Sequence, residues 1–160
     1  MEIVKLNASY IEQTKDLLVD LQQYIISIDK YKLNIISKDY REKYFEYMLD
    51  DCKNNQGEIF VALESNEVAG MVAGYIQNYT DRDKLDYSCP PKGIIAELMV
   101  NKKFRSNGVG TALVNHMENY FKSLGCEYIQ LDVFSYNESA KKFYHKNGYE
   151  DRMHTLFKKI

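Results

Sequence analysis

The sequence predicts a single α/β domain over residues 1–160, with a mixed, mostly antiparallel sheet that carries helices on both faces. Two apolar strand patterns, 58–64 and 68–77, flank a three-residue turn, which is typical of an antiparallel hairpin. A strand, an amphipathic helix and another strand then follow over residues 93–134. This second arrangement requires a right-handed crossover and a parallel strand pair. The sheet is therefore expected to be mixed.

The first third of the chain predicts one short strand and two helices. Residues 2–6 alternate polar and apolar side chains, as a strand does. Ser9 and Glu12 have the spacing of a capping box, and apolar residues recur after them at helical intervals up to Ile28. Ser37 is expected to cap a second helix, whose apolar surface is made of a group of large side chains: Tyr40, Tyr44, Phe45, Tyr47 and Met48.

The rest of the chain predicts a loop, strands and two more helices. Residues 78–92 are polar, contain both prolines and predict a loop, and 93–100 are apolar and predict a buried strand. A glycine-containing turn leads into a third helix that ends near Gly125. A strand over 128–134, a fourth helix between Asn137 and Gly148, and one or two closing strands from Tyr149 onward are expected to complete the fold.

Composition excludes several classes of protein. The 160 residues are 45% hydrophobic and 28% charged, which excludes wholesale disorder. A net charge of −2 argues against a broad nucleic-acid-binding face. No apolar run approaches the length of a membrane span, so no membrane partner is expected. The three cysteines are widely spaced and form no CxxC pair, so neither a disulfide framework nor a metal site is indicated, and a cytoplasmic location is expected.

The turn between residues 101 and 110 is the most informative segment. It leaves a buried strand and enters an amphipathic helix, and Asn107, Gly108 and Gly110 allow the backbone to turn tightly. Several backbone N–H groups then face one concavity at a helix N-terminus, a place that favours an anion. Lys102, Lys103 and Arg105 add positive charge close by. The segment therefore predicts a phosphate or pyrophosphate site.

Two common phosphate-binding patterns fit this turn poorly. A Walker loop requires a lysine before the serine or threonine, and no lysine precedes Thr111. A dinucleotide fingerprint requires a third glycine, but Leu113 occupies that position. A helix start that uses glycine only for close packing, with solvated basic side chains, is the remaining structural alternative.

Two motifs together resemble the GNAT-type N-acetyltransferase superfamily. Arg105-x-x-Gly108-x-Gly110 follows a strand and is similar to the family's pyrophosphate signature. One strand later, residues 137–149 (NESAKKFYHKNGY) resemble its second signature, N-x-x-A-x-x-F-Y-x-K-x-G-F/Y. The resemblance is specific from residue 93 to residue 149 and only topological before that.

The resemblance implies an acetyl-CoA site between strands four and five, which splay apart in this family. Backbone groups of Leu98, Met99 and Val100 are expected to pair with the pantetheine arm, and Asn137 is expected to anchor it from the other side. A row of residues around the turn is expected to hold the pyrophosphate: Arg105, Ser106, Asn107, Gly108, Val109, Gly110 and Thr111. No metal is required. The expected reaction is direct transfer of the acetyl group to a primary amine, on a small molecule or on a protein.

Two residues are candidates for catalysis. The resemblance places Tyr144 near the thioester sulfur, where a phenol can donate a proton to the leaving thiolate. The alternative is a core tyrosine beside Phe143. Glu97 interrupts an apolar strand, where a carboxylate is costly unless it faces a cleft or is paired. It is either a general base or a structural or substrate-binding carboxylate.

Other chemistry-bearing residues have simpler interpretations. The three histidines match no metal site and are expected at the surface or in the core. Cys89 lacks the partners of a nucleophile. Several acidic residues could receive a cationic amine, although a solvated role is the simpler interpretation: Asp29, Asp51, Glu64, Asp81, Asp83 and Asp86. Acceptor specificity is expected from residues 29–37 and 78–92, where this superfamily usually shapes it.

Alternative functions remain open at this point. A regulatory module that binds acyl-CoA without turnover and a nucleotide-binding domain are the two competitors. Dimers are common in the superfamily, so a homodimer is also an expectation by analogy.

Overall fold

The computed structural model describes all residues, 1–160, and contains one five-stranded sheet with strands in the order β1-β2-β3-β4-β5. The strands are β1 (Glu2–Lys5), β2 (Glu58–Glu64), β3 (Glu67–Ile76), β4 (Lys92–Val100) and β5 (Tyr128–Gln130). The first four pair antiparallel, and β4 pairs parallel with β5. The predicted mixed sheet is confirmed.

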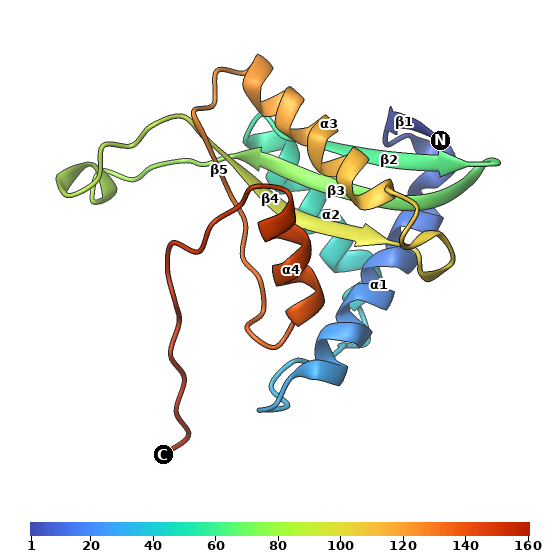
Figure 1. Ribbon diagram of the computed structural model, residues 1–160, viewed down its shortest axis with the longest axis horizontal. Helices are drawn as coiled ribbons and strands as arrows, with labels where there is room; N and C mark the ends of the chain where they lie inside the picture. Colours follow the sequence, from blue (N-terminus) through green and yellow to red (C-terminus); the bar gives the residue numbers. More distant parts are fainter.

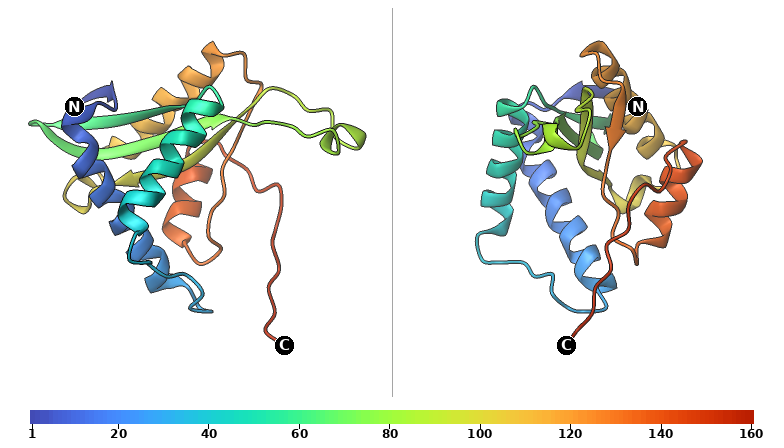
Figure 2. Two further views of the ribbon diagram at one scale, coloured as in Figure 1. Left: turned by 180° about the vertical axis from the view of Figure 1, so that it is seen from behind. Right: turned by 90° about the vertical axis from the view of Figure 1, so that its left-hand side faces the viewer.

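Four helices cover the sheet: α1 (Ile11–Ile28), α2 (Tyr40–Asn54), α3 (Val109–Ser123) and α4 (Glu138–Lys146). Helices α1 and α2 lie on one face, and α3 and α4 lie on the other, as the front and back views show (Figures 1 and 2). Three short 3-10 turns accompany them: Ala8–Tyr10, Asp83–Leu85 and Lys102–Phe104. Helices on both faces agree with the predicted α/β class.

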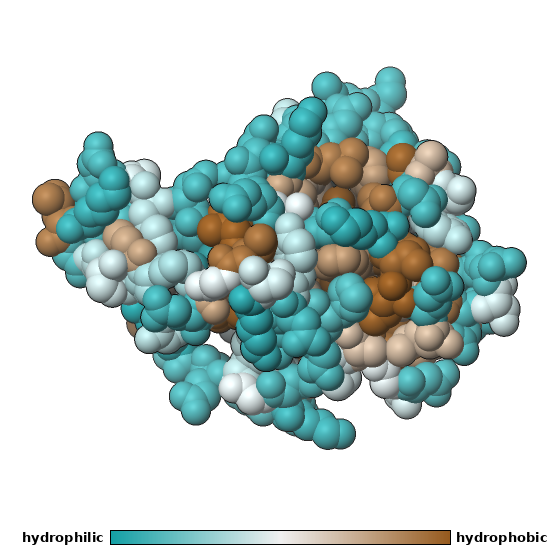
Figure 3. All heavy atoms as spheres, turned by 90° about the horizontal axis from the view of Figure 1, so that it is seen from above, coloured by the Kyte–Doolittle hydropathy of each residue, from teal (hydrophilic) through white to brown (hydrophobic).

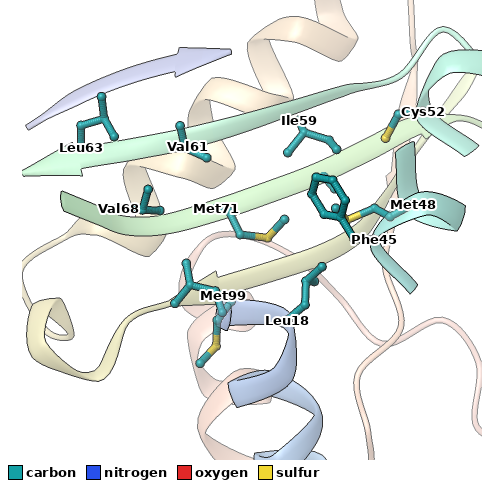
Figure 4. Close-up of a cluster of buried hydrophobic side chains, with 12 residues drawn as sticks. Leu18, Phe45, Met48, Cys52, Ile59, Val61, Leu63, Val68, Met71 and Met99 are labelled. Atoms are coloured by element: carbon teal, nitrogen blue, oxygen red, sulfur yellow. The ribbon is translucent and has the colours of Figure 1, made fainter. Parts of the chain in front are cut away.

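Each face of the sheet has its own apolar core, because alternate strand residues point to opposite sides. On the α1/α2 face, Leu18, Phe45 and Met71 belong to a cluster of 12 buried residues (Figure 4). On the other face, Leu113, Met117 and Phe121 of α3 belong to a cluster of 9. Residues from β4 contribute to both clusters, so this strand is held between the two layers.

Strand β4 carries a bulge at its middle. The register with β3 shifts so that Ala73 opposes Glu97 and Gly74 opposes Ile95, which leaves Ala96 without a partner. A bulge bends its strand and re-aims the neighbouring side chains. The bulge therefore separates an N-terminal half of β4, beside β5, from a C-terminal half that leads to α3.

Two predicted caps are wrong and two are confirmed. Asn7, not Ser9, provides the first side-chain cap, since its Oδ1 accepts from the Ser9 backbone N–H at 3.0 Å. Helix α2 begins at Tyr40 without a side-chain cap, and Ser37 contributes only a carbonyl to that turn. The left-handed Gly125 (φ 78°) ends α3 as predicted, and Asn137 caps α4 through the Ala140 N–H.

The largest departure from the prediction is at the C-terminus. The last strand stops at Gln130 instead of Phe134, and residues 149–160 form no strand. A strand requires a partner edge, and β5 offers an edge of only three residues. Residues 150–160 are exposed and extend away from the sheet (Figure 1), with Tyr31 donating to the Phe157 carbonyl at 3.0 Å.

Residues 77–91 form an arm that projects beyond the sheet (Figure 1). Seen from above, the surface has hydrophilic regions and several apolar areas over the body of the molecule, and a small apolar group marks the tip of this arm (Figure 3). Leu85 lies in the 3-10 turn of this segment and is 85% exposed. No helix in the structure combines the length and apolar character needed to cross a membrane.

Candidate active site

The site is built where β4 and β5 part. The two strands pair only at their first residues, from Lys92 opposite Tyr128 to Ile94 opposite Gln130. Strand β4 continues for six more residues to Val100 while remaining paired with β3 on its other side. Because backbone groups of a strand point alternately to its two sides, part of the backbone near Leu98 and Met99 faces the gap that β5 leaves. An extended ligand can pair with these groups.

The turn after β4 presents a row of free backbone donors. The N–H groups of residues 106–111 donate to no acceptor within the protein. Ser106 (φ 65°) and Gly108 (φ 80°) adopt left-handed conformations, which curve the backbone before α3 begins at Val109. The free N–H groups and the N-terminal end of the helix dipole together favour an anion here.

The basic side chains around this turn differ in their contacts. Arg105 folds back and donates through Nε to the Val100 carbonyl at 3.2 Å. Lys103 forms an ion pair with Glu67 of β3, whereas Lys102 is exposed and makes no ion pair. The turn therefore offers one anchored guanidinium and one free ammonium close to the row of amides.

Helix α4 approaches the start of α3 closely. A Cβ at Gly110 would lie 3.3 Å from the Phe143 ring, so glycine at this position permits the close contact between the two helices. Asn137, at the start of α4, is buried and its Oδ1 accepts from the Ala140 N–H at 3.1 Å. Tyr24 of α1 donates to the same oxygen at 3.3 Å. The Asn137 oxygen is thus occupied, and its amide nitrogen donates to no protein group.

Glu97 lies just after the bulge and is hydrogen-bonded by helix α2, which covers this face of the sheet. Tyr44 of α2 donates a hydrogen bond to Glu97 Oε1, and the Tyr40 ring stacks on Tyr44 with centroids 4.8 Å apart. Burial raises the pKa of Glu97 above its ordinary value, and the hydrogen bond from Tyr44 partly offsets that rise. A carboxylate with a raised pKa is better suited to accept a proton at neutral pH.

Tyr144 stands on α4 with its ring packed between aromatic neighbours. The ring centroids of Phe143 and Tyr149 lie 5.1 and 5.6 Å away. Burial raises the pKa of Tyr144, and the Glu97 carboxylate raises it further. The phenol therefore stays protonated near neutral pH and lies within electrostatic reach of Glu97. A proton acceptor and a proton donor thus come from two different elements to one region.

A pocket of about 90 Å³ lies on the α2 side of the bulge. Glu97 and Ala96 form its β4 wall, Tyr75 contributes from β3, and α2 supplies the rest of the lining: Tyr44, Tyr47, Met48 and Asp51. The pocket contains two carboxylates and three phenols and no basic side chain. It connects the Glu97 region to the surface.

The loop between α1 and α2 is organised by Asp29, which is buried. Its carboxylate accepts from the backbone N–H groups of Tyr31, Leu33 and Asn34, and from the Asn34 side chain at 2.9 Å. These hydrogen bonds lower the pKa of Asp29 to about 2. Asp29 is therefore a structural residue of the loop and offers no free charge to an acceptor.

The remaining candidates lie apart from Glu97 and Tyr144 in separate contacts. His116 packs on Phe60, and His145 contacts Asp151 at 3.1 Å. Cys89 donates to the Tyr87 carbonyl at 3.3 Å, and Asp81 pairs with Lys84. No three of the histidine, cysteine and acidic residues gather in a group that could hold a metal ion.

The contribution of α2 to the site was not predicted from the sequence. Tyr44 and Tyr47 were expected on the apolar surface of the helix, but Tyr44 contacts Glu97 and Tyr47 is 65% exposed. A signal was available, because Tyr40, Tyr44, Tyr47 and Asp51 recur at intervals of three and four residues. Such spacing places polar-tipped side chains on one helix face. Nothing in the sequence, however, indicates that this face meets the bulge of β4.

Comparison with known proteins agrees with this geometry. Residues 24–149 match the family model described as Acetyltransferase (GNAT) family. Two relatives come from Methanocaldococcus jannaschii. The uncharacterized N-acetyltransferase MJ1530 is 39% identical over 54% of the chain and 51% of its own length. The uncharacterized N-acetyltransferase MJ1207 is 30% identical over 95% of the chain and 66% of its own length.

The match to these relatives covers about half to two thirds of their length. Among solved structures, the aminoglycoside N-acetyltransferase AAC(6')-Iy in complex with CoA has a TM-score of 0.70 at 17% identity, covering 99% of this chain and 98% of that one. This likeness shows the fold. With a family model that matches most of the chain and a sheet that opens between β4 and β5, the chain belongs to the GNAT acetyltransferase family.

Proposed function

We propose that the protein is an acetyl-CoA-dependent N-acetyltransferase that transfers the acetyl group directly to a primary amine. One observation carries the proposal. The backbone amides of residues 106–111 donate no hydrogen bond within the protein, and they follow strand β4 beyond the point where β5 stops pairing with it. The gap suits the extended pantetheine arm, and the turn suits the pyrophosphate. The solved structure of a family member with CoA supports this choice of ligand.

Each binding residue has a proposed role. Leu98, Met99 and Val100 pair with the arm through their backbone groups. The pyrophosphate is bound by Arg105, Ser106, Asn107, Gly108, Val109, Gly110 and Thr111. Asn137 donates to the arm through its amide nitrogen, because its oxygen already caps α4.

The proposed reaction uses two side chains to move protons. The neutral amine attacks the thioester carbonyl carbon, so that a C–N bond forms and the C–S bond then breaks. Glu97 accepts the proton that the amine nitrogen loses, directly or through water. Tyr144 donates a hydrogen bond, and then a proton, to the departing thiolate, and transfer of a proton from Glu97 to Tyr144 through solvent restores both groups. Holding both substrates in one geometry contributes much of the rate enhancement. The products are an N-acetyl amine and free CoA.

The proposal covers one acetyltransferase domain over residues 1–160 that works in the cytoplasm, either alone or as a homodimer. The acceptor is a small amine or an amine on a protein. The free state of all three cysteines is compatible with a reducing compartment.

A thiol-release assay with a panel of amines tests this function. We expect amine-dependent release of CoA, and thermal stabilisation by CoA but not by ATP or NAD. Tight CoA binding without release for any acceptor would instead favour a non-catalytic acyl-CoA-binding module. Stabilisation by ATP or NAD alone would favour a nucleotide-binding domain.

Glu97→Gln tests the assignment of the general base. The raised pKa of Glu97 predicts that kcat/KM increases with pH as this carboxyl ionises. The variant, which cannot ionise, is expected to lose that increase. If the pH profile keeps its shape in the variant, Glu97 is a structural or substrate-binding residue.

A further inference from the structure

We infer that the pocket between α2 and β4 selects acceptors that carry a second cationic group, with Asp51 as the residue that determines this specificity. The inference rests on the proposed function and names the substrate class for the same site. It comes from the lining of the pocket, in which carboxylates and phenol rings occur without a basic side chain.

The two carboxylates stand at different places along the pocket. Tyr44, which donates a hydrogen bond to Glu97, and Asp51 both line the pocket from α2. Tyr44 and Asp51 are seven residues apart, which is about 10 Å along a helix axis. A reacting amine beside Glu97 therefore leaves Asp51 free to contact a different group of the same molecule.

The rings between these carboxylates suit a cation. Tyr44, Tyr47 and Tyr75 line the pocket, and phenol faces attract an ammonium group. The Asp51 charge contributes to the raised pKa of Tyr75, after burial, so Asp51 and the Tyr75 ring share one environment. Asp132, which follows β5, acts on Tyr75 in the same direction. The carboxylates near Tyr75 thus give this environment a negative charge.

The volume of the pocket limits the size of the group that enters. Its 90 Å³ suits a slim alkylammonium arm. The expected acceptor is a short aliphatic diamine, or a longer polyamine that enters by one such end.

The acceptor chemistry balances with no net release of a proton, because the reacting amine enters neutral and CoA leaves as the thiol. The reacting nitrogen enters as a neutral amine, attacks the thioester and becomes an amide, while its proton passes to Glu97 and CoA leaves as the thiol. The second nitrogen stays protonated throughout and contacts Asp51. Only one of the two amines is acetylated, because the other is held away from the thioester.

Three acceptors with four-carbon chains test the inference: butylamine, putrescine and γ-aminobutyrate. They end in a methyl group, an ammonium group and a carboxylate, respectively. We expect kcat/KM to be highest for putrescine, lower for butylamine and lowest for γ-aminobutyrate. The preference for putrescine over butylamine should weaken as salt is added, because Asp51 is exposed and its charge is screened.

Asp51→Asn is expected to reduce the putrescine-to-butylamine ratio of kcat/KM roughly fivefold, the scale of one partly exposed ion pair. Asp50→Asn is the matched control, since it removes the same charge from an exposed neighbour that does not line the pocket. Calorimetry of putrescine binding to the CoA complex gives a second readout, in which Asp51→Asn is expected to weaken binding by the same factor.

Equal rates for putrescine and butylamine, or equal effects of the two asparagine variants, would overturn the inference while leaving the proposed function intact. Failure of the proposed function itself would give a different result. If acetyl-CoA binds and no acceptor in any series releases thiol, the proposed function is wrong, and the specificity assigned to Asp51 is wrong with it.

Discussion

The two halves of β4 have opposite environments although they belong to one strand. Gly93 and Ile94 are paired on both sides, with β3 and β5, and Gly93 lies directly under the Phe121 ring of α3. Residues 97–100 are paired only with β3. The closed half fixes α3 on the sheet, and the open half leaves backbone groups for a ligand. The bulge at Ala96 lies between them, so one strand supplies both a scaffold and a site.

Loss of the Tyr144 hydroxyl is expected to have the largest effect on the open half. Tyr144→Phe should lower kcat by roughly 100-fold or more, because the thiolate loses its proton donor. Steady-state kinetics with acetyl-CoA and a responsive amine measure this, with Tyr128→Phe, an exposed tyrosine, as the control. An unchanged kcat would remove Tyr144 from the mechanism.

A methyl group in the closed half is expected to act on stability. A Cβ at Gly93 would lie 2.4 Å from the Phe121 ring, so the helix and strand must shift apart. Gly93→Ala should lower the free energy of unfolding by about 2–3 kcal/mol, the usual cost of overpacking. Urea unfolding measures the change. A midpoint equal to that of the native protein would show that α3 is not fixed at this position.

The same substitution in the turn that follows the open half is expected to separate stability from binding. Nothing lies within 4 Å of a Cβ at Gly108, but its φ of 80° disfavours alanine by about 1 kcal/mol. Gly108→Ala should therefore unfold slightly more easily and bind acetyl-CoA more weakly, since the amides no longer hold their curve. Calorimetry of CoA binding checks this. Unaltered CoA affinity would contradict a phosphate site in the turn.

The smallest expected effect concerns the hydrogen bond between α2 and the open half. Tyr44 lowers the pKa of Glu97, so Tyr44→Phe should raise that pKa. The rise of kcat/KM with pH would then begin at a higher pH, while acetyl-CoA binding stays constant. A profile that moves to lower pH, or does not move, would contradict the effect of this hydrogen bond on Glu97.

The closed half of β4 and helix α3, which it supports, were predictable from the sequence. The open half was predictable only in part. Apolar periodicity predicts β4 and α3, and Gly125 and Asn137 have the local chemistry of helix ends. These are local signals. The α2 contact with Glu97 depends on long-range packing, since Tyr44 and Glu97 are 53 residues apart. No spacing rule relates a helix face to a bulge on a strand of a different layer.

The C-terminal segment also shows that local sequence does not determine long-range contacts. Met153, Leu156 and Phe157 give residues 149–157 the composition of a strand, yet all three side chains are exposed. Composition indicates that a segment can extend, but pairing decides whether it becomes a strand. The short β5 ladder provides no long edge for it.

Backbone amide chemical shifts recorded while CoA is added test the central claim most directly. We predict that the largest changes fall on residues 106–111 and on Leu98, Met99 and Val100, while residues 92–94 change little. Uniform small changes along β4, or changes centred on the closed half, would contradict the division of the strand into a scaffold and a ligand-binding half.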